Sequence, residues 1–409
     1  VIGSALNFDP TVAVNNTVPN TVGTFGYSNL LLSEIFNPLT KLENTYNESN
    51  GDKLYGKLEL QYSILKNLKL TTRYGYTKWD QVGKSFTPFV FYGPLNVENT
   101  MNADGTPVTG KHNSVYESTF SAFNYTSETF ANYNTNINEE HFFDVVAGFS
   151  FAESKGHGFN TNRQDVRDNS WAWADISAAT GENSIENINA YTGASFQNLT
   201  RRNISYFGRL NYDYVDKYLA SFTLRRDGSI AFGPENKFAN FYAASLGWVV
   251  SEEDFLDYEW LDFLKIRGSY GTTGNENVSP QYVSIATGGP SYGSTANSNG
   301  YTFGTASGAI FVPGSTVNSF SNETLSWERQ TQMNFGFDVT LWKHLSLTAD
   351  YFRKEVEGLL FVDAPPLMAG TSLPVATNIG TTRSKGLDLS LNYSNTIGRD
   401  LRLSTTLTF

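Results

Sequence analysis

Few residues of this chain are of the types that do covalent or metal chemistry. The sequence contains no cysteine, which excludes a disulfide scaffold, a cysteine nucleophile and a thiolate metal site. We predict no metal-binding residue and no cofactor, because the histidines stand too far apart in sequence to form a zinc-type cluster. These histidines are His112, His141, His157 and His344.

Motifs that carry catalysis are absent as well. The Gly-His-Gly stretch at 156–158 lacks the third glycine and the strand–turn–helix context of a dinucleotide-binding fingerprint. No nucleophile elbow, Walker A, zinc-protease or EF-hand spacing occurs. Pairs of glutamates at 139–140 and 252–253 fall in short predicted connections, where solvated turn charges are expected. We therefore predict no catalytic residue, no cofactor-binding residue and no enzymatic activity.

Trp171 and Trp173 are the candidate ligand-binding residues. Both lie in a long segment, 155–202, that we predict to be a connection between strands. Exposed tryptophans can stack on sugar rings or anchor a partner, because the amphipathic indole is enriched at interfaces. The alternative, which we favour, is that the two rings pin the loop to the rim of the protein.

The composition excludes several classes of protein. The chain has 409 residues, with 29 lysines and arginines against 40 aspartates and glutamates, so its net charge is −11. General nucleic-acid binding is excluded, because it needs surplus cations. No run of about 18 apolar residues is present, so no transmembrane helix is encoded. Hydrophobic residues make up only 40% of the chain, yet 15% are aromatic. This combination is typical of an outer-membrane β-barrel with aromatic girdles.

Alternation of apolar and polar residues predicts the elements that position these side chains. In 325–342, Phe335 and Phe337 share the apolar parity, whereas Asn334 and Asp338 share the polar one. Successive side chains of a strand point to opposite faces, so one face is predicted to meet lipid and the other water. The pattern predicts about twelve strands, at 54–62, 68–79, 118–136, 141–154, 203–214, 218–227, 238–250, 263–272, 325–342, 345–356, 385–393 and 401–409.

The connections between the predicted strands alternate between short and long. This rhythm predicts an all-β, transmembrane, antiparallel up-and-down β-barrel with short periplasmic turns and long extracellular loops. We assign 1–53 to an extracellular lead-in and 54–409 to the strands and loops of the same domain. Loops of this length are functional more often than idle. The short connections are 63–67, 137–140, 215–217, 343–344 and 394–400, the long ones are 80–117, 155–202, 273–324 and 357–384, and those of medium length are 228–237 and 251–262.

Two kinds of side chain mark the predicted rims of the barrel. Arg225 falls on the polar parity of its strand and Arg226 on the apolar parity. Arg226 is therefore predicted at the outer rim, where a charge costs far less than at the bilayer midplane. Trp248 and Trp342 stand next to short turns and fit an aromatic belt at that face, with packing against a neighbouring strand as the alternative.

Several stretches in order resemble the SusC/RagA group of TonB-dependent outer-membrane transporters. Within 203–274 these are SYFGRLNYDYVDKYLASFTLRRDGSIAFGPENKF, SLGWVVSEEDFL and WLDFLKIRGSYGTTGN. Further stretches are SNETLSWERQTQMNFGFDVTLWKHLSLTADYFRKEVEGLL at 321–360 and NIGTTRSKGLDLSLNY at 378–393. The early barrel region of the family is similar to ALNFDPTVAV at 5–14 and YSILKNLKLTTRYGY at 62–76. The resemblance covers almost the whole chain.

The resemblance implies energy-coupled import across the outer membrane. The implied partners are the TonB–ExbB–ExbD complex, which pulls on a plug domain, and a SusD-like lipoprotein that caps the external mouth. The implied substrate is too large for ordinary porins: an oligosaccharide most often, otherwise a peptide. We match no plug, TonB box or last barrel strands in 1–409, so we expect the middle of a barrel of about 22 strands and a piece of a longer protein.

Two alternatives remain open at this point. The chain could belong to a passive porin-like or structural outer-membrane barrel that has no plug. It could also be a soluble β-rich surface module, either an adhesin or a glycan-binding domain. The presence of a plug separates the first alternative from an importer, and a requirement for detergent separates the second from both.

Overall fold

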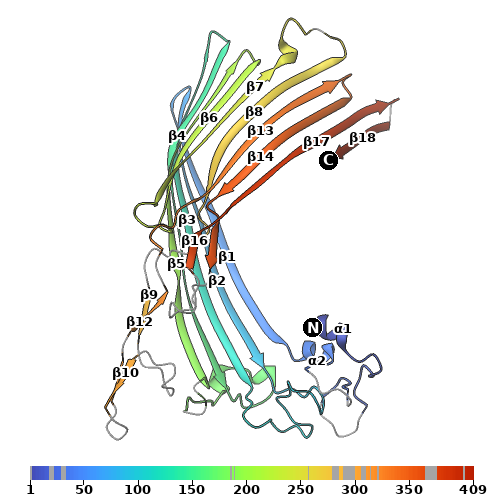
Figure 1. The fold of residues 1–409 in the computed structure, drawn as a ribbon, viewed down its shortest axis with the longest axis vertical. Helices are drawn as coiled ribbons and strands as arrows, with labels where there is room; N and C mark the ends of the chain where they lie inside the picture. Colours follow the sequence, from blue (N-terminus) through green and yellow to red (C-terminus); the bar gives the residue numbers. More distant parts are fainter. Residues whose placement is uncertain are drawn as a thin grey trace.

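The computed structural model describes residues 2–17, 23–28, 34–184, 187, 189–256, 258–278, 285–288, 300–304, 310–313, 315–319, 322–363, 375–398 and 401–409. Twelve strands form one curved sheet, with β1 and β18 at its two edges (Figure 1). In spatial order they are β1 (Tyr46–Leu65), β2 (Leu68–Thr87), β3 (Ser114–Ile137), β4 (His141–Gln164), β5 (Tyr191–Tyr214), β6 (Tyr218–Ser229), β7 (Phe238–Val249), β8 (Leu261–Asn275), β13 (Glu328–Leu341), β14 (Leu345–Glu357), β17 (Thr381–Ile397) and β18 (Leu401–Thr408).

The predicted all-β, up-and-down architecture is confirmed. Each of the twelve predicted segments is a strand of this sheet, and every neighbouring pair runs antiparallel. Strands that follow one another in the main sheet's chain order are also neighbours in space. β1 and β18 do not pair with each other, so the described chain forms part of a barrel wall and not a closed barrel.

The first five strands are longer than predicted, and they extend toward the long connections. They contain 20 to 24 residues, whereas a membrane-spanning strand needs about 9–11. β1 begins at Tyr46, so the predicted lead-in 1–53 ends eight residues early, and 46–53 belong to the sheet. The sequence pattern missed these extensions because polar residues occupy both parities there, as in Glu48, Ser49 and Asn50.

The two faces of the sheet have opposite chemistry. We call the parity of Phe335 and Phe337 the outer face and the parity of Asn334 and Asp338 the inner face. Phe335 is 59% exposed on the outer face, whereas Asn334 and Asp338 are partly covered and hydrogen-bonded. The predicted division of β13 into an apolar and a polar face is therefore confirmed.

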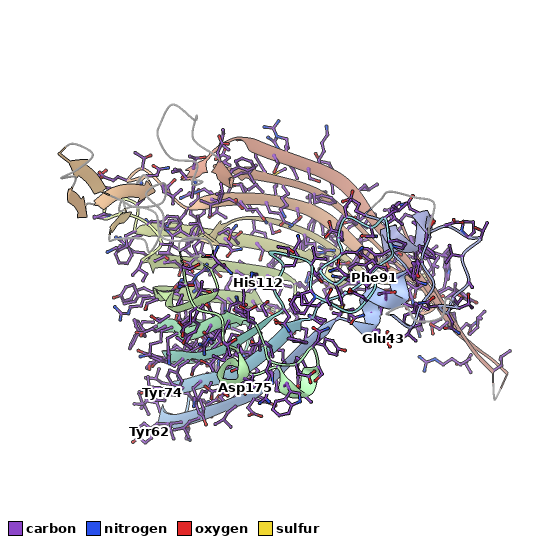
Figure 2. The ribbon with its side chains drawn as sticks, turned by 90° about the horizontal axis from the view of Figure 1, so that it is seen from below. Glu43, Tyr62, Tyr74, Phe91, His112 and Asp175 are labelled. Atoms are coloured by element: carbon purple, nitrogen blue, oxygen red, sulfur yellow. The ribbon has the colours of Figure 1, made fainter. Side chains whose placement is uncertain are left out.

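Short and long connections lie at opposite ends of the sheet (Figure 1). The short α-helices α1 (Ile2–Asn7) and α2 (Pro38–Glu43) lie at the end of the long connections. Figure 2, viewed from this end, shows Phe91 and His112 in the long connections, apart from Tyr62 on β1. No helix among the described residues is long and apolar enough to cross a membrane.

The long connections contain local structure that the sequence pattern did not predict. The connection after β4 contains two 3₁₀ turns, and another 3₁₀ turn follows β7. Hairpins form between β8 and β13 and between β14 and β17, although much of the Gly/Ser-rich stretch 286–308 lies outside the described residues. These elements are η1 (Trp171–Trp173), η2 (Ile176–Ala178), η3 (Val250–Glu252), β9 (Ile285–Gly288), β10 (Gly300–Phe303), β11 (Ile310–Pro313), β12 (Ser315–Ser319), β15 (Leu360–Asp363) and β16 (Val375–Asn378).

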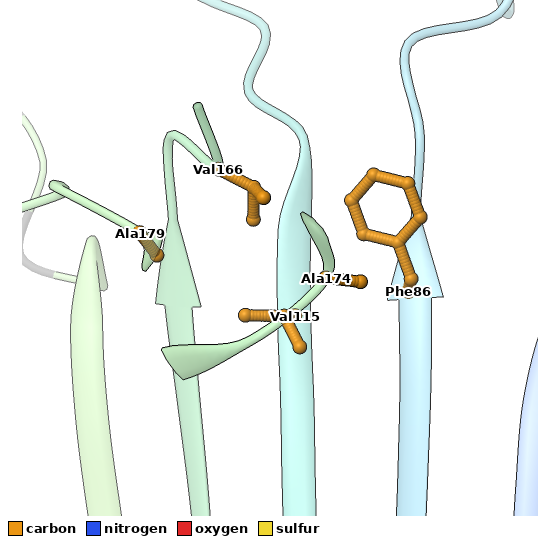
Figure 3. Packing of buried hydrophobic residues seen from close by; sticks show 5 residues of the cluster. All are labelled: Phe86, Val115, Val166, Ala174 and Ala179. Carbon is orange, nitrogen blue, oxygen red and sulfur yellow. The ribbon is translucent and has the colours of Figure 1, made fainter. Parts of the chain in front are cut away.

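Buried apolar side chains gather where the long connections return to the strands. One cluster joins Phe86 of β2 and Val115 of β3 to Val166, Ala174 and Ala179 of the connection after β4 (Figure 3). A second cluster is centred on the fully buried side chains of Phe232 and Leu325. The core therefore sits under the loops, and the wall between these clusters is a single layer of sheet.

Candidate functional site

Two adjoining hollows lie in the inner face of the sheet, over β5–β8 and β13. Their volumes are about 520 and about 290 Å³. Both hollows are lined by Ser221, Ser245, Ser269 and Asn334, one residue from each of four neighbouring strands. These hydroxyl and amide groups can exchange hydrogen bonds with a polar solute, because each offers both donor and acceptor capacity.

An arginine with two aspartates forms the charged part of this surface. Arg267 on β8 donates from Nε to Asp338 Oδ2 at 2.9 Å and from its terminal nitrogens to Asp350 at 2.7 Å. Thr348 Oγ1 donates to Asp338 Oδ1 at 2.9 Å. One guanidinium thus faces two carboxylates, so this group of side chains carries a net negative charge.

A glycine creates the space in which this network forms. Gly336 on β13 pairs in register with Arg267 on one side and with Asp350 on the other. A Cβ atom at Gly336 would lie 2.7 Å from the carbonyl oxygen of Ala349 and would collide with the Asp350 carboxylate. The absence of a side chain therefore lets residues of β8 and β14 meet across the strand between them.

A third hollow, of about 320 Å³, lies nearer the long connections. Arg225 lines it and donates to Asp227 at 2.7 Å and to Ser205 Oγ at 2.9 Å. Asn203 donates to Glu276 Oε1, whereas Glu276 Oε2 is buried and has no hydrogen-bond partner among the described residues. The inner position predicted for Arg225 is confirmed, since Arg225 contacts an inner-face serine across the β5–β6 pair.

The inner face is polar from β1 to β5 as well. Arg73 on β2 donates to Glu59 on β1 at 2.9 Å and to Glu128 on β3 at 3.4 Å. Asp144 on β4 accepts from Asn132 at 2.8 Å. Hydrogen-bonded polar side chains thus line the inner face from one edge strand to the middle of the sheet.

Two of the histidines that we considered for chemistry have structural contacts. His112 Nδ1 lies 2.6 Å from Asp165 Oδ1, and His141 Nδ1 lies 2.8 Å from the Tyr212 hydroxyl. Within the described residues, no three histidine, aspartate or glutamate side chains gather as a metal site would require. The prediction that no residue acts in catalysis stays a prediction.

Glu253 is more than the solvated turn charge that we predicted. Its carboxylate accepts from the Tyr218 hydroxyl at 2.6 Å and from Trp248 Nε1 at 3.0 Å, and Lys217 lies 3.7 Å away. These hydrogen bonds, first from Tyr218 and then from Trp248, hold the pKa of Glu253 below its usual value. Trp248 also stacks on Tyr218, with ring centroids 6.4 Å apart. Trp248 thus packs against a neighbouring strand, whereas Trp342 is exposed at the β13–β14 turn, as an aromatic belt requires.

The two candidate ligand-binding tryptophans lie in different environments. Trp171 is partly buried against the first cluster, stacks on Tyr46 at 5.7 Å, and has the Lys84 ammonium 5.0 Å from its ring centroid. Trp173 is 51% exposed, with the Arg167 guanidinium 6.0 Å from its ring. Trp171 therefore pins the connection to the strands, and Trp173 is the ring that is available to a ligand.

The family of the chain follows from comparison with known proteins. The model of the TonB dependent receptor-like β-barrel family matches residues 3–409. The chain belongs to this family. TonB-dependent receptor P3 of Formosa agariphila is 29% identical over the whole chain and 37% of its own length. TonB-dependent receptor SusC of Bacteroides thetaiotaomicron is 26% identical over 98% of the chain and 38% of its own length. The resemblance to the SusC/RagA group is confirmed.

A solved structure shows the same wall. A structure of the RagAB peptide importer in its closed-closed state superposes with a TM-score of 0.73 at 20% identity, and covers 96% of this chain and 39% of that one. The chain spans 30–38% of the length of the curated relatives that it matches. The family match favours the membrane barrel over the soluble β-rich module.

Proposed function

We propose that this chain forms part of the wall of a TonB-dependent importer in an outer membrane, and that its inner face lines the path of a large polar nutrient. The observation that carries the proposal is the pairing of a polar, hydrogen-bonded inner face with an outer face on which apolar side chains are exposed. A lipid-embedded wall around a water-filled lumen needs this arrangement. Family membership supplies the energy-coupled class of transport.

An oligosaccharide is the substrate that we propose first. The shared residues of the two hollows are three serines and an asparagine, which suit the hydroxyl groups of a sugar. A peptide is the second candidate, since the structural relative RagAB is a peptide importer. Trp173 is the proposed ligand-contacting ring of the long connections.

The partners follow from the same proposal. The free edges of β1 and β18 need further strands, because a barrel leaves no backbone edge exposed to lipid. We propose that a plug inside the completed barrel couples it to TonB–ExbB–ExbD, and that a SusD-like surface lipoprotein covers its external mouth. No residue of the chain is assigned a role in covalent chemistry.

A pair of adjacent substitutions tests the proposal. Asn334→Trp places a large ring in both hollows, whereas Phe335→Trp places the same ring on the outer face. In cells that produce the full-length transporter, uptake of labelled oligosaccharides or peptides should fall with Asn334→Trp and stay unchanged with Phe335→Trp. Wild-type uptake should also stop when a protonophore removes the proton-motive force.

Two outcomes would contradict the proposal. Uptake that persists with the protonophore would indicate a passive porin-like barrel. Equal uptake by Asn334→Trp, Phe335→Trp and the wild type would show that the solute does not pass along this part of the inner face.

A further inference from the structure

A groove also opens on the outer face, and Trp327 lies between it and the third inner hollow. The groove has a volume of about 560 Å³ and lies between the long-connection ends of β7 and β13. Phe238, Asn240 and Tyr242 line one side, and Trp327 and Arg329 line the other. The first three share the parity of the outer-face residue Leu246 on β7, and the last two share the parity of Phe335 on β13.

The groove exists because two strands separate. β7 and β8 are paired up to Ala243 and Gly271 and no further toward the long connections. Beyond this point Thr272 Oγ1 accepts from the backbone N–H of Tyr242 at 3.1 Å, in place of a ladder partner. Trp327 packs against Phe232, with ring centroids 5.1 Å apart, and anchors one wall to the second buried cluster.

On the outer face, the apolar side chains near the short turns give way to charged ones at the level of this groove. On β6 the outer-face residues Phe222 and Leu224 are followed by Arg226, and on β13 the outer-face residues Phe335 and Met333 lead to Arg329. Counted from the short-turn end, Arg226 is the ninth residue of β6 and Arg329 is the thirteenth residue of β13. A strand crosses the hydrocarbon in about 9–11 residues, so both arginines reach the level of lipid headgroups.

These two arginines differ from three outer-face cations of other strands, which pair with carboxylates. Lys78 pairs with Asp80, Arg202 pairs with Glu153, and Arg383 pairs with Glu355. Arg226 and Arg329 have no carboxylate within ion-pair distance in the part of the chain that the structure describes. Instead, the Arg226 guanidinium lies 5.1 Å from the Phe238 ring, and that of Arg329 lies 5.8 Å from the Phe241 ring.

We propose that this groove binds the phosphate of an outer-leaflet lipid, an inference that rests on the proposed outer-membrane location. Guanidinium groups bind phosphate through paired hydrogen bonds, and the rings beneath them hold their planes. Phe238 and Tyr242 are each more than 40% exposed and offer an apolar surface to an acyl chain. Arg329 lines the groove and Arg226 lies over the ring of its wall residue Phe238, so the charge, the level and the outer-face position all fit a phosphorylated lipid.

The test is lipid binding by the full-length protein in detergent micelles. The probes are fluorescent phosphatidic acid, diacylglycerol with the same chains, and inorganic phosphate as a competitor. Phosphatidic acid should bind at least about tenfold more tightly than diacylglycerol, and Arg226→Gln with Arg329→Gln should remove this preference. Arg226→Lys with Arg329→Lys should retain part of it, because the charge remains.

The matched control is Lys155→Gln, which removes an exposed outer-face cation that already pairs with Glu153 at 3.7 Å. It should leave binding unchanged, and heat-modifiable mobility on gels confirms that each variant is folded. Equal binding of phosphatidic acid and diacylglycerol, or no loss in the double glutamine variant, would overturn the proposal. Displacement of phosphatidic acid by inorganic phosphate at the same concentration as the lipid would show a general anion site. This result would also overturn the proposal.

Uptake measured in parallel separates this inference from the proposed function. Both proposals would be supported if the double glutamine variant loses the lipid preference and the wild type shows both the preference and energy-dependent uptake. Absence of lipid preference in a wild-type protein that imports its nutrient would overturn the lipid site alone. A wild-type protein that shows the lipid preference but does not import would overturn the importer and leave the lipid site.

Discussion

The contacts of individual side chains on the inner face depend on the space that residues of the neighbouring strands leave for them. Arg267 meets Asp350 only because residue 336, between them in register, is glycine. None of these three positions was singled out from the sequence, where Arg267 and Asp350 stand 83 residues apart. The available signal was their polar parity, and register is needed to convert parity into contact.

Adding a methyl group at Gly336 should therefore be costly. Gly336→Ala forces the Asp350 carboxylate and the Ala349 backbone to move, so we expect the free energy of unfolding to fall by about 1–3 kcal/mol. Gly268→Ala on the adjacent strand is the control, because its Cβ would meet other atoms only at 3.9 Å. The measurement is urea unfolding of the folded barrel in detergent, and equal midpoints for the two variants would contradict this account of the network.

The Glu253 carboxylate should make stability depend on pH. Its folded-state pKa is held below the ordinary value of 4.5, so its stabilisation is complete above that value and is lost as the pH falls through the lowered pKa. The wild type should melt at a higher temperature than Glu253→Gln at about pH 6, and the difference should shrink toward about pH 3. Glu252→Gln removes a neighbouring charge that accepts neither ring hydrogen bond, and a pH-dependent difference of the same size there would contradict the assignment.

At the scale of elements, strand identity was predictable and strand length was not. All twelve strands of the sheet were predicted because apolar and polar residues alternate where one face meets lipid. On β4 the outer face changes from Phe149 and Phe151 to Glu153 and Lys155, and the apolar alternation ends there. Beyond that level both faces of β1–β5 meet water. Polar residues therefore occupy both parities, and the sequences resemble those of loops.

The connection after β4 should be fastened by Trp171 and not by Trp173. Loss of the Tyr46 stack and of the Lys84 contact should cost the connection about 1–2 kcal/mol. Trp171→Ala should therefore raise the rate of external protease cleavage within 165–190 by about 5- to 30-fold. Trp173→Ala should leave cleavage unchanged and lower nutrient uptake, and the reverse assignment of these two effects would contradict the interpretation.

The middle of β6 tests the lipid-facing wall. Phe222→Arg places a charge on the outer face, which costs about 2–4 kcal/mol near the midplane. Thr223→Arg places the same side chain in the inner hollow, where it stays solvated. The yield of heat-modifiable barrel in the outer membrane should fall strongly for the first variant and little for the second. Equal yields would argue against lipid contact at this strand.

At the scale of the whole molecule, the described chain is a wall with two free edges. The sequence predicted the order of the strands and the alternation of short and long connections. It did not predict the outer groove, because the point at which the β7–β8 ladder ends is set by register, which the alternation of residues does not give. Nor did it predict the clamp around Glu253, since the two rings that it binds come from different strands.

The central claim is that one face of this sheet meets lipid and the other meets water. Residues 1–409 contain no cysteine, so single-cysteine variants report one position each once any cysteine elsewhere in the full-length protein is replaced. In intact outer membranes, Phe335→Cys should react with a lipid-soluble maleimide and resist a water-soluble one. The neighbouring Asn334→Cys should react with the water-soluble reagent through the lumen. The opposite pattern, or water-soluble labelling of both positions, would contradict a lipid-embedded wall and with it the importer that we propose.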